Sequence, residues 1–406
     1  MADAGDLYIS WRWRDDTAAA GVGVAPQAQV RQAISRVSAA LPDPADPTGL
    51  QSALTTGAFA DYRSEHELAQ YLSQVFLPYG LAVQLHDLFV RGIRPQLRIQ
   101  PSPRVAQIPW ELLAPDPGLR LLDLADISQL APVALAQAPT RNTRSWNETR
   151  ELPVVAVLDP RVPGFRADSA LGSVLGRMYA AAPLARRVEQ YLPQDRLRPA
   201  VTDPIEAFRR TDVDRDWLGR TLRAGASRLL YVGHVTAATP ESGRAEQARL
   251  HLACTADLDG RAEPIRVHRP LSALDLILGE GELDGSRRWP MPSRVALIAC
   301  ESGGDLRFGE PLGLLAAMIH GGAELVTAGR WALPTDLAYR RFAGVDERIR
   351  PLQEAVCAID AAHDRPDPIR TLSAWQRERA AAWRDTGSIE YSPVSWAAFT
   401  TISTSD

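Results

Sequence analysis

Four uninterrupted runs of apolar residues constrain the fold of this chain more than any other feature. The runs lie within residues 151–160 (ELPVVAVLDP), 228–234 (RLLYVGH), 294–300 (RVALIAC) and 325–331 (LVTAGRW). An apolar run without polar alternation predicts a strand that is buried on both faces. Helical spacing of apolar residues predicts helices over 171–192, 312–319, 336–342 and 352–363. Buried strands alternating with helices predict an α/β fold, with a mostly parallel central sheet flanked by helices.

The length of the chain indicates more than one lobe. A chain of 406 residues exceeds the size, roughly 300 residues, at which a single hydrophobic core usually stops growing. Residues 131–150 hold few large apolar side chains and several charges, which is typical of an exposed connection. We therefore expect a smaller N-terminal α+β lobe over residues 1–150 and the main α/β core over residues 151–406.

Charge and cysteine content disfavour several classes of protein. The formal net charge is −4, whereas a nucleic-acid-binding protein needs a surplus of basic residues. Three widely spaced cysteines cannot form a disulfide framework and favour a reducing, cytoplasmic environment. The sequence has no signal-peptide pattern and no apolar stretch of about 20 residues, so we expect no membrane association. It also lacks C-x-x-C, H-E-x-x-H and phosphate-binding glycine motifs, which disfavours zinc chemistry and nucleotide binding.

Two of the predicted strands end on residues that can perform nucleophilic chemistry. RLLYVG is followed by His234, and RVALIA is followed by Cys300. Reactive groups of open parallel sheets collect at the carboxyl ends of the strands, and imidazole is the usual base for a thiol. Free cysteine is among the most buried residue types, so a cysteine at the end of an apolar strand, taken alone, is more often an inert core thiol. The matching position of His234 and the glycine-rich loop ESGG (301–304) favour a cysteine–histidine pair instead.

Several segments of the sequence resemble those of the CHAT domain family, the prokaryotic caspase-like cysteine peptidases related to caspases and separases. The resemblance covers the chain from about residue 85 to its C-terminus. The segments that carry it, in the order of the family, are IPWELL (108–113), YVGH (231–234), LIACESGG (297–304), the helix–turn–strand–helix region 309–338 and PVSWAAFTTIS (393–403).

The resemblance implies a caspase-like catalytic core and a cysteine endopeptidase. Cys300 would be the nucleophile and His234 the proton shuttle, and the backbone N–H groups of Cys300 and Val235 would hold the oxyanion. This chemistry needs no cofactor and no metal. The family also implies limited cleavage of a protein partner in bacterial signalling or defence, with a regulatory protein partner.

Two departures from the family pattern leave a second function open. Val235 stands where the family usually has glycine after the histidine, and Ile298 stands where it usually has serine. A stiff β-branched residue at position 235 restricts access for a substrate. The alternative is therefore a catalytically impaired pseudo-protease that acts as a scaffold or regulatory binding module.

Three further residues are candidates for substrate binding. Asp159 ends the first apolar run, at the strand edge where Cys300 and His234 are expected. Its carboxylate would favour arginine before the scissile bond, although an Asp-Pro turn also closes many strands without any such role. Glu301 offers a second negative charge beside the nucleophile. Trp331 ends the fourth apolar run and would be either a pocket wall or a core residue.

Overall fold

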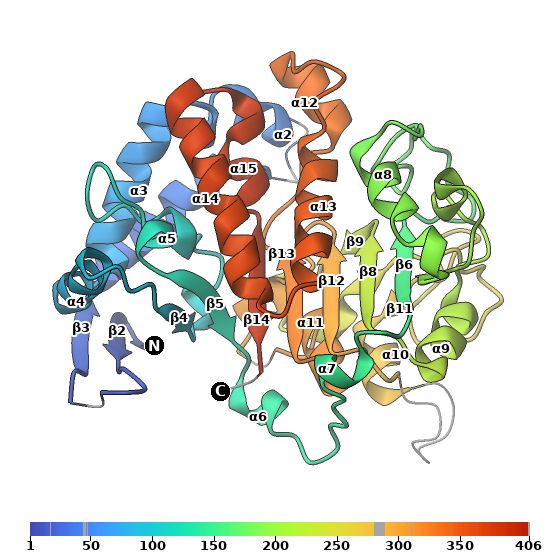
Figure 1. Ribbon diagram of the computed structural model, residues 1–406, viewed down its shortest axis with the longest axis horizontal. Coiled ribbons are helices and arrows are strands. Elements are labelled where there is room, and N and C mark those ends of the chain that lie inside the picture. The colour runs from blue at the N-terminus through green and yellow to red at the C-terminus, as the bar shows by residue number, and fades with distance from the viewer. Residues whose placement is uncertain (17, 44–45, 47, 280–288, 310, 405–406) are drawn as a thin grey trace.

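A mostly parallel sheet runs through the centre of the protein (Figure 1). The computed structural model describes all residues except 17, 44–45, 47, 280–288, 310 and 405–406. The strands of this sheet are β4 (Gln96–Ile99), β5 (Asp126–Leu130), β6 (Val154–Leu158), β7 (Leu197–Arg198), β8 (Arg228–Val232), β12 (Arg294–Ile298), β13 (Leu325–Gly329) and β14 (Phe399–Ser403). Among the described residues these eight strands follow the order β4-β5-β14-β13-β12-β8-β6-β7. Only the pair β13–β14 is antiparallel, which confirms the predicted α/β fold.

The four predicted central strands form as β6, β8, β12 and β13. Every residue in each of them is buried, as the uninterrupted apolar runs require. The predicted helices at 312–319, 336–342 and 352–363 form as α11 (Leu314–His320), α12 (Asp336–Ala343) and α13 (Pro351–His363). The other α-helices in the described part of the chain are α1 (Gln27–Ala40), α2 (Gly49–Thr55), α3 (Tyr62–Phe76), α4 (Tyr79–Val90), α5 (Leu121–Leu124), α6 (Val133–Ala136), α7 (Trp146–Thr149), α8 (Pro183–Glu189), α9 (Arg215–Ala224), α10 (Ala273–Leu278), α14 (Pro368–Thr386) and α15 (Pro393–Trp396).

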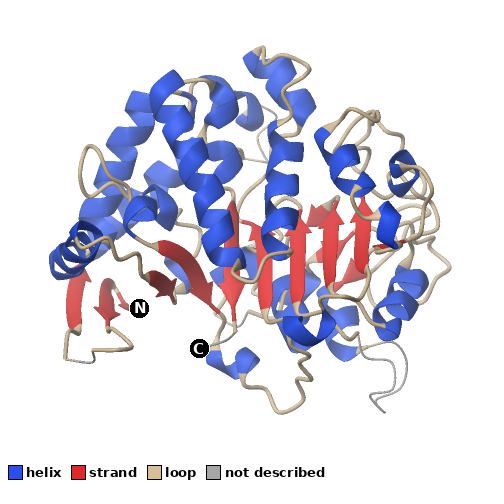
Figure 2. Cartoon of the chain, in the orientation of Figure 1, coloured by secondary structure: helices blue, strands red, loops and turns tan. Residues whose placement is uncertain are grey.

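Helices cover both faces of the sheet (Figure 2). Alternate residues of β12 belong to different hydrophobic clusters, because successive strand side chains point to opposite faces. Ala296 and Ile298 share a cluster with Val356 of α13, whereas Val295 and Leu297 share one with the side chains of α11. The sheet is thus the middle layer of three, with a separate apolar core on each side. Every helix in the described part of the chain is too short or too polar to cross a lipid bilayer.

The N-terminal part of the chain adds a small sheet and several helices. Strands β1 (Ala2–Ala4), β2 (Asp6–Trp11) and β3 (Gly21–Ala25) pair antiparallel beside α1, α3 and α4. Strands β4 and β5 also precede residue 150, but they extend the central sheet. A third small sheet consists of β9 (Val235–Thr236), β10 (Arg249–Leu250) and β11 (Leu271–Ser272). The division into lobes at residue 150 stays a prediction.

The predicted helix over 171–192 is wrong over most of its length. Residues 183–189 are α-helical, as α8, and Leu192 begins a short 3-10 helix (Leu192–Gln194), whereas residues 171–182 form turns, bends and irregular backbone. The backbone N–H groups of Val174 and Leu175 donate to the carboxylate of Asp159, at 3.1 and 3.4 Å, instead of entering a helical ladder. Gly176 adopts φ +69°, which a helix excludes. Side-chain contacts from outside the segment therefore override its helical spacing.

A buried ion pair ties the N-terminal helices to the C-terminal helix α14. Both terminal guanidinium nitrogens of Arg120, Nη1 and Nη2, donate to the carboxylate of Glu65 on α3, each at 2.7 Å. Trp383 of α14 donates to the same carboxylate at 3.2 Å. The side chain of Glu65 is fully buried, and that of Arg120 is 9% exposed. Such a bidentate pair satisfies two charges that water cannot reach.

We expect Glu65→Gln to destabilise the protein by about 3 kcal/mol, because the substitution removes the carboxylate charge that the buried Arg120 guanidinium binds. Urea unfolding, followed by tryptophan fluorescence, measures this change. Glu67→Gln is the matched control on the same helix, since Glu67 forms a solvent-exposed ion pair with Arg63. Equal unfolding midpoints for the two variants would contradict the expectation.

Candidate active site

The register between β8 and β12 places His234 and Cys300 at the same edge of the sheet. These parallel strands pair Val232 with Ile298, and the N–H of Gly233 donates to the carbonyl of Ile298 at 3.3 Å. His234 lies two residues after Val232, and Cys300 lies two residues after Ile298. Adjacent strands lie about 4.8 Å apart, so the two residues leave the sheet side by side. Both are only partly buried.

A backbone carbonyl fixes the orientation of the His234 imidazole. Nε2 of His234 lies 3.0 Å from the carbonyl oxygen of Gly172. A carbonyl oxygen only accepts hydrogen bonds, so Nε2 carries the proton and Nδ1 of the neutral ring keeps its lone pair. Burial lowers the pKa of His234 below its usual value, although the bond to Gly172 raises it. The imidazole is therefore neutral at pH 7 and able to accept a proton on Nδ1.

The thiol of Cys300 is held by the loop after β13. Its Sγ accepts from the backbone N–H of Leu333 at 3.3 Å. Burial raises the pKa of this thiol, and the charge of Glu301 raises it further, whereas the N–H of Leu333 lowers it. In the described structure the thiol and the imidazole each bond to backbone groups and not to each other. Cys300 is thus a protonated thiol at neutral pH that needs a base.

The loop after Cys300 is anchored to the end of β13. Ser302 donates through Oγ to the carbonyl of Leu297 at 2.6 Å and accepts from the N–H of Gly329 at 2.8 Å. The N–H of Gly303 donates to the carbonyl of Gly329 at 2.9 Å. A Cβ at position 303 would lie 3.2 Å from the Cβ of Ala328, so the close approach favours glycine here. These contacts hold the turn that presents Cys300.

Val235 begins β9, so the backbone after His234 belongs to a small antiparallel sheet. Val235 pairs with Leu250 of β10, and the N–H of His251 donates to the carbonyl of His234 at 3.1 Å. Tyr231 donates its hydroxyl to the same carbonyl at 2.6 Å. The sheet therefore fixes the backbone on which an oxyanion donor at Val235 would depend.

The three predicted substrate-binding residues lie in different surroundings. Asp159 is 1% exposed and accepts from the hydroxyl of Ser173 at 2.5 Å. Glu301 accepts from Arg307 at 3.1 Å, in a partly exposed ion pair. Trp331 is buried in the core, where its Nε1 donates to the carbonyl of Val394 at 3.2 Å. Their role in substrate binding stays a prediction.

The sequence analysis did not identify Glu111 and Arg330, which support the strand end that binds the loop after Cys300. Arg330 donates through both terminal nitrogens to the carboxylate of Glu111, at 2.6 and 2.8 Å. The next residue, Trp331, accepts at its carbonyl from the N–H of Glu301 at 3.2 Å. Glu111 lies in the IPWELL segment, so the resemblance pointed to this segment without indicating its contact with Arg330.

The other two cysteines are poor candidates for a nucleophile. Cys254 is buried, and burial raises its pKa to about 11. Cys357 lies within α13, where burial raises its pKa to about 12. Among the residues that the structure describes, no three His, Cys, Asp or Glu side chains gather as a metal centre would require.

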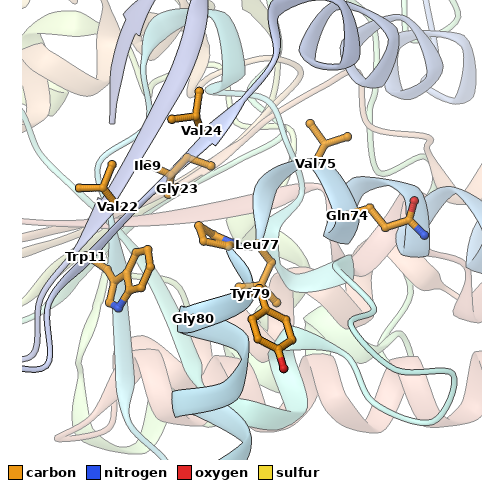
Figure 3. A pocket seen from close by; sticks show the side chains of 11 residues that line it. Ile9, Trp11, Val22, Gly23, Val24, Gln74, Val75, Leu77, Tyr79 and Gly80 are labelled. Atoms are coloured by element: carbon orange, nitrogen blue, oxygen red, sulfur yellow. The ribbon is translucent and has the colours of Figure 1, made fainter.

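A groove of about 330 Å³ lies away from this edge of the sheet, in the N-terminal region. Figure 3 shows it between the small sheet and the junction of α3 with α4, where Trp11, Val22 and Tyr79 line it. Neither His234 nor Cys300 contributes to its lining. Cys300 and His234 therefore lie outside this groove.

Comparison with known protein families matches residues 66–404 to the CHAT domain. The match starts before residue 85, where the sequence resemblance was expected to begin, and it includes α3 from residue 66 onward. No curated protein matches the chain. Because the matched region covers most of the chain and contains both His234 and Cys300, the chain belongs to the CHAT domain family.

Proposed function

We propose that this protein is a cysteine endopeptidase in which Cys300 and His234 act as a unit. The observation that carries the proposal is their equivalent position after adjacent parallel strands, two residues beyond the pair Val232–Ile298. Membership of a family related to caspase-like peptidases supports it. The neutral imidazole and the protonated thiol supply the base and the acid that the first step needs.

The proposed reaction proceeds in two stages. Nδ1 of His234 takes the thiol proton, and the thiolate of Cys300 attacks the peptide carbonyl carbon. Backbone N–H groups of Cys300 and Val235 stabilise the oxyanion. The C–N bond then breaks as His234 returns the proton to the leaving amine. Water, deprotonated by the same imidazole, hydrolyses the thioester and regenerates the thiol.

We further propose limited cleavage of a protein partner in the bacterial cytoplasm, in signalling or defence and under the control of a regulatory protein. This role rests on membership of the family alone. The two departures from the family pattern, Val235 and Ile298, favour the alternative of a pseudo-protease that acts as a scaffold or regulatory binding module. The two functions differ in whether the thiol forms an acyl intermediate.

We expect Cys300→Ala and His234→Ala each to abolish peptide cleavage, and the double variant to lose little more, because the two side chains serve the same step. A fluorogenic peptide library, varied at the residue before the scissile bond, measures cleavage. Cys254→Ala and Cys357→Ala are the controls and should retain activity.

Cleavage by Cys300→Ala at the wild-type rate would refute the assignment of the nucleophile. A wild-type protein as inactive as Cys300→Ala, and equally unreactive toward a cysteine-directed peptide warhead, would favour the scaffold.

We expect the alkylation of Cys300 by iodoacetamide to accelerate as the pH rises from 6 to 9. Its raised pKa leaves little thiolate at neutral pH, and the thiolate is the reactive form. Peptide mapping by mass spectrometry measures the rate, and Cys254 and Cys357 should stay unmodified until the protein is denatured. A rate that is already maximal at pH 6 would indicate a thiolate–imidazolium pair and contradict the expectation.

A further inference from the structure

We infer that Arg209 and Asp159 are positioning residues for the imidazole of His234, acting through the carbonyl of Gly172. The inference rests on the proposed function of His234 as the base. It gives Asp159 a role different from the predicted substrate binding.

The carbonyl oxygen of Gly172 receives two hydrogen bonds. Nε2 of His234 donates at 3.0 Å, and Nη1 of Arg209 donates at 3.1 Å. Gly172 is buried, and a Cβ at this position would lie 2.3 Å from the carbonyl oxygen of Ala167. The loop can therefore bring its backbone this close only with glycine.

The carboxylate of Asp159 anchors the residues that follow Gly172. It accepts from the hydroxyl of Ser173 at 2.5 Å and from the N–H groups of Val174 and Leu175 at 3.1 and 3.4 Å. It also accepts from Nη1 of Arg209 at 3.3 Å. A single guanidinium nitrogen thus bridges the anchoring carboxylate and the carbonyl that orients the imidazole.

Both residues are held in an unusual backbone conformation, Asp159 beside the end of β8 and Arg209 beside the end of β6. Asp159 has φ +51° and Arg209 has φ +55°, values that residues other than glycine rarely adopt. The N–H of Asp159 donates to the carbonyl of Val232 at 2.6 Å, two residues before His234. The N–H of Arg209 donates to the carbonyl of Leu158 at 3.2 Å. The two residues with strained backbone are therefore the same two whose side chains bind the Gly172 loop.

The two charges act on His234 in opposite directions. Burial is the largest influence and lowers the pKa of His234; the charge of Asp159 raises it, and the charge of Arg209 lowers it. The titratable and charged groups around the ring are Asp159 after β6, Arg209 after residues 204–207, His251 after β10 and Cys300 after β12. Removing one charge at a time should shift the pKa in opposite directions. A loop that merely loosened would admit water and raise it in every variant.

The test is an NMR titration of ¹³C-histidine-labelled protein in a Cys300→Ala background, with the His234 signal identified by its loss in His234→Ala. We expect Arg209→Gln to raise the pKa of His234 and Asp159→Asn to lower it. Arg210→Gln is the matched control, because it removes the neighbouring ion pair with Asp212 and leaves Gly172 untouched. It should cause no shift. Shifts in the same direction for both variants, or shifts no larger than in the control, would overturn the inference.

If Asp159→Asn does not fold, the titration of Arg209→Lys tests the inference instead. This variant keeps the positive charge, so the pKa of His234 should stay near that of the parent, whereas a loosened loop would raise it and refute the inference. Because the titration needs no catalysis, its outcome is independent of the proposed function. A protein that cleaves no peptide but shows the opposed shifts would refute the peptidase and retain the positioning role. A peptidase without those shifts would retain the enzyme and refute the positioning role.

Discussion

The parallel hydrogen bonding between β8 and β12 is the constraint on which the candidate site depends. Both strands are buried on two faces, and each face packs in a different core, so their register is fixed by which side chains face α11 and which face α13. A slip of one residue would exchange the two faces and turn Cys300 away from His234. The pairing of Val232 with Ile298 therefore decides whether a nucleophile and a base can meet at this edge.

The sequence predicts the central strands and the position of the cysteine–histidine pair because both follow from local patterns. An apolar run without alternation marks a buried strand, and a reactive residue directly after such a run must lie at the sheet edge. The same use of local patterns gave a wrong helix for the segment of residues 171–182. Its apolar residues have helical spacing, yet its N–H groups bind Asp159, and no local pattern reports that contact. Arg209 likewise carries no signal in the sequence, since its partners lie 37 and 50 residues away.

Groups from distant parts of the chain converge on the two reactive residues. The nucleophile loop rests on the end of β13, which the buried pair Glu111–Arg330 joins to a segment 219 residues upstream. The imidazole of His234 is hydrogen-bonded to the Gly172 loop, which precedes β8 in the sequence. The rigid sheet thus supplies the position of Cys300 and His234, and separate loops supply the orientation of each.

The buried pair Glu65–Arg120 has a consequence for how the chain can be divided. A fragment without α3 would leave Arg120 and the indole N–H of Trp383 inside the protein with no acceptor from Glu65. We therefore expect that α3 cannot be removed, or exchanged for an unrelated helix, without loss of stability. As long as Arg120 stays in place, any substitute segment would have to bring a carboxylate to the same buried point, so this one negative charge constrains which segments could replace α3.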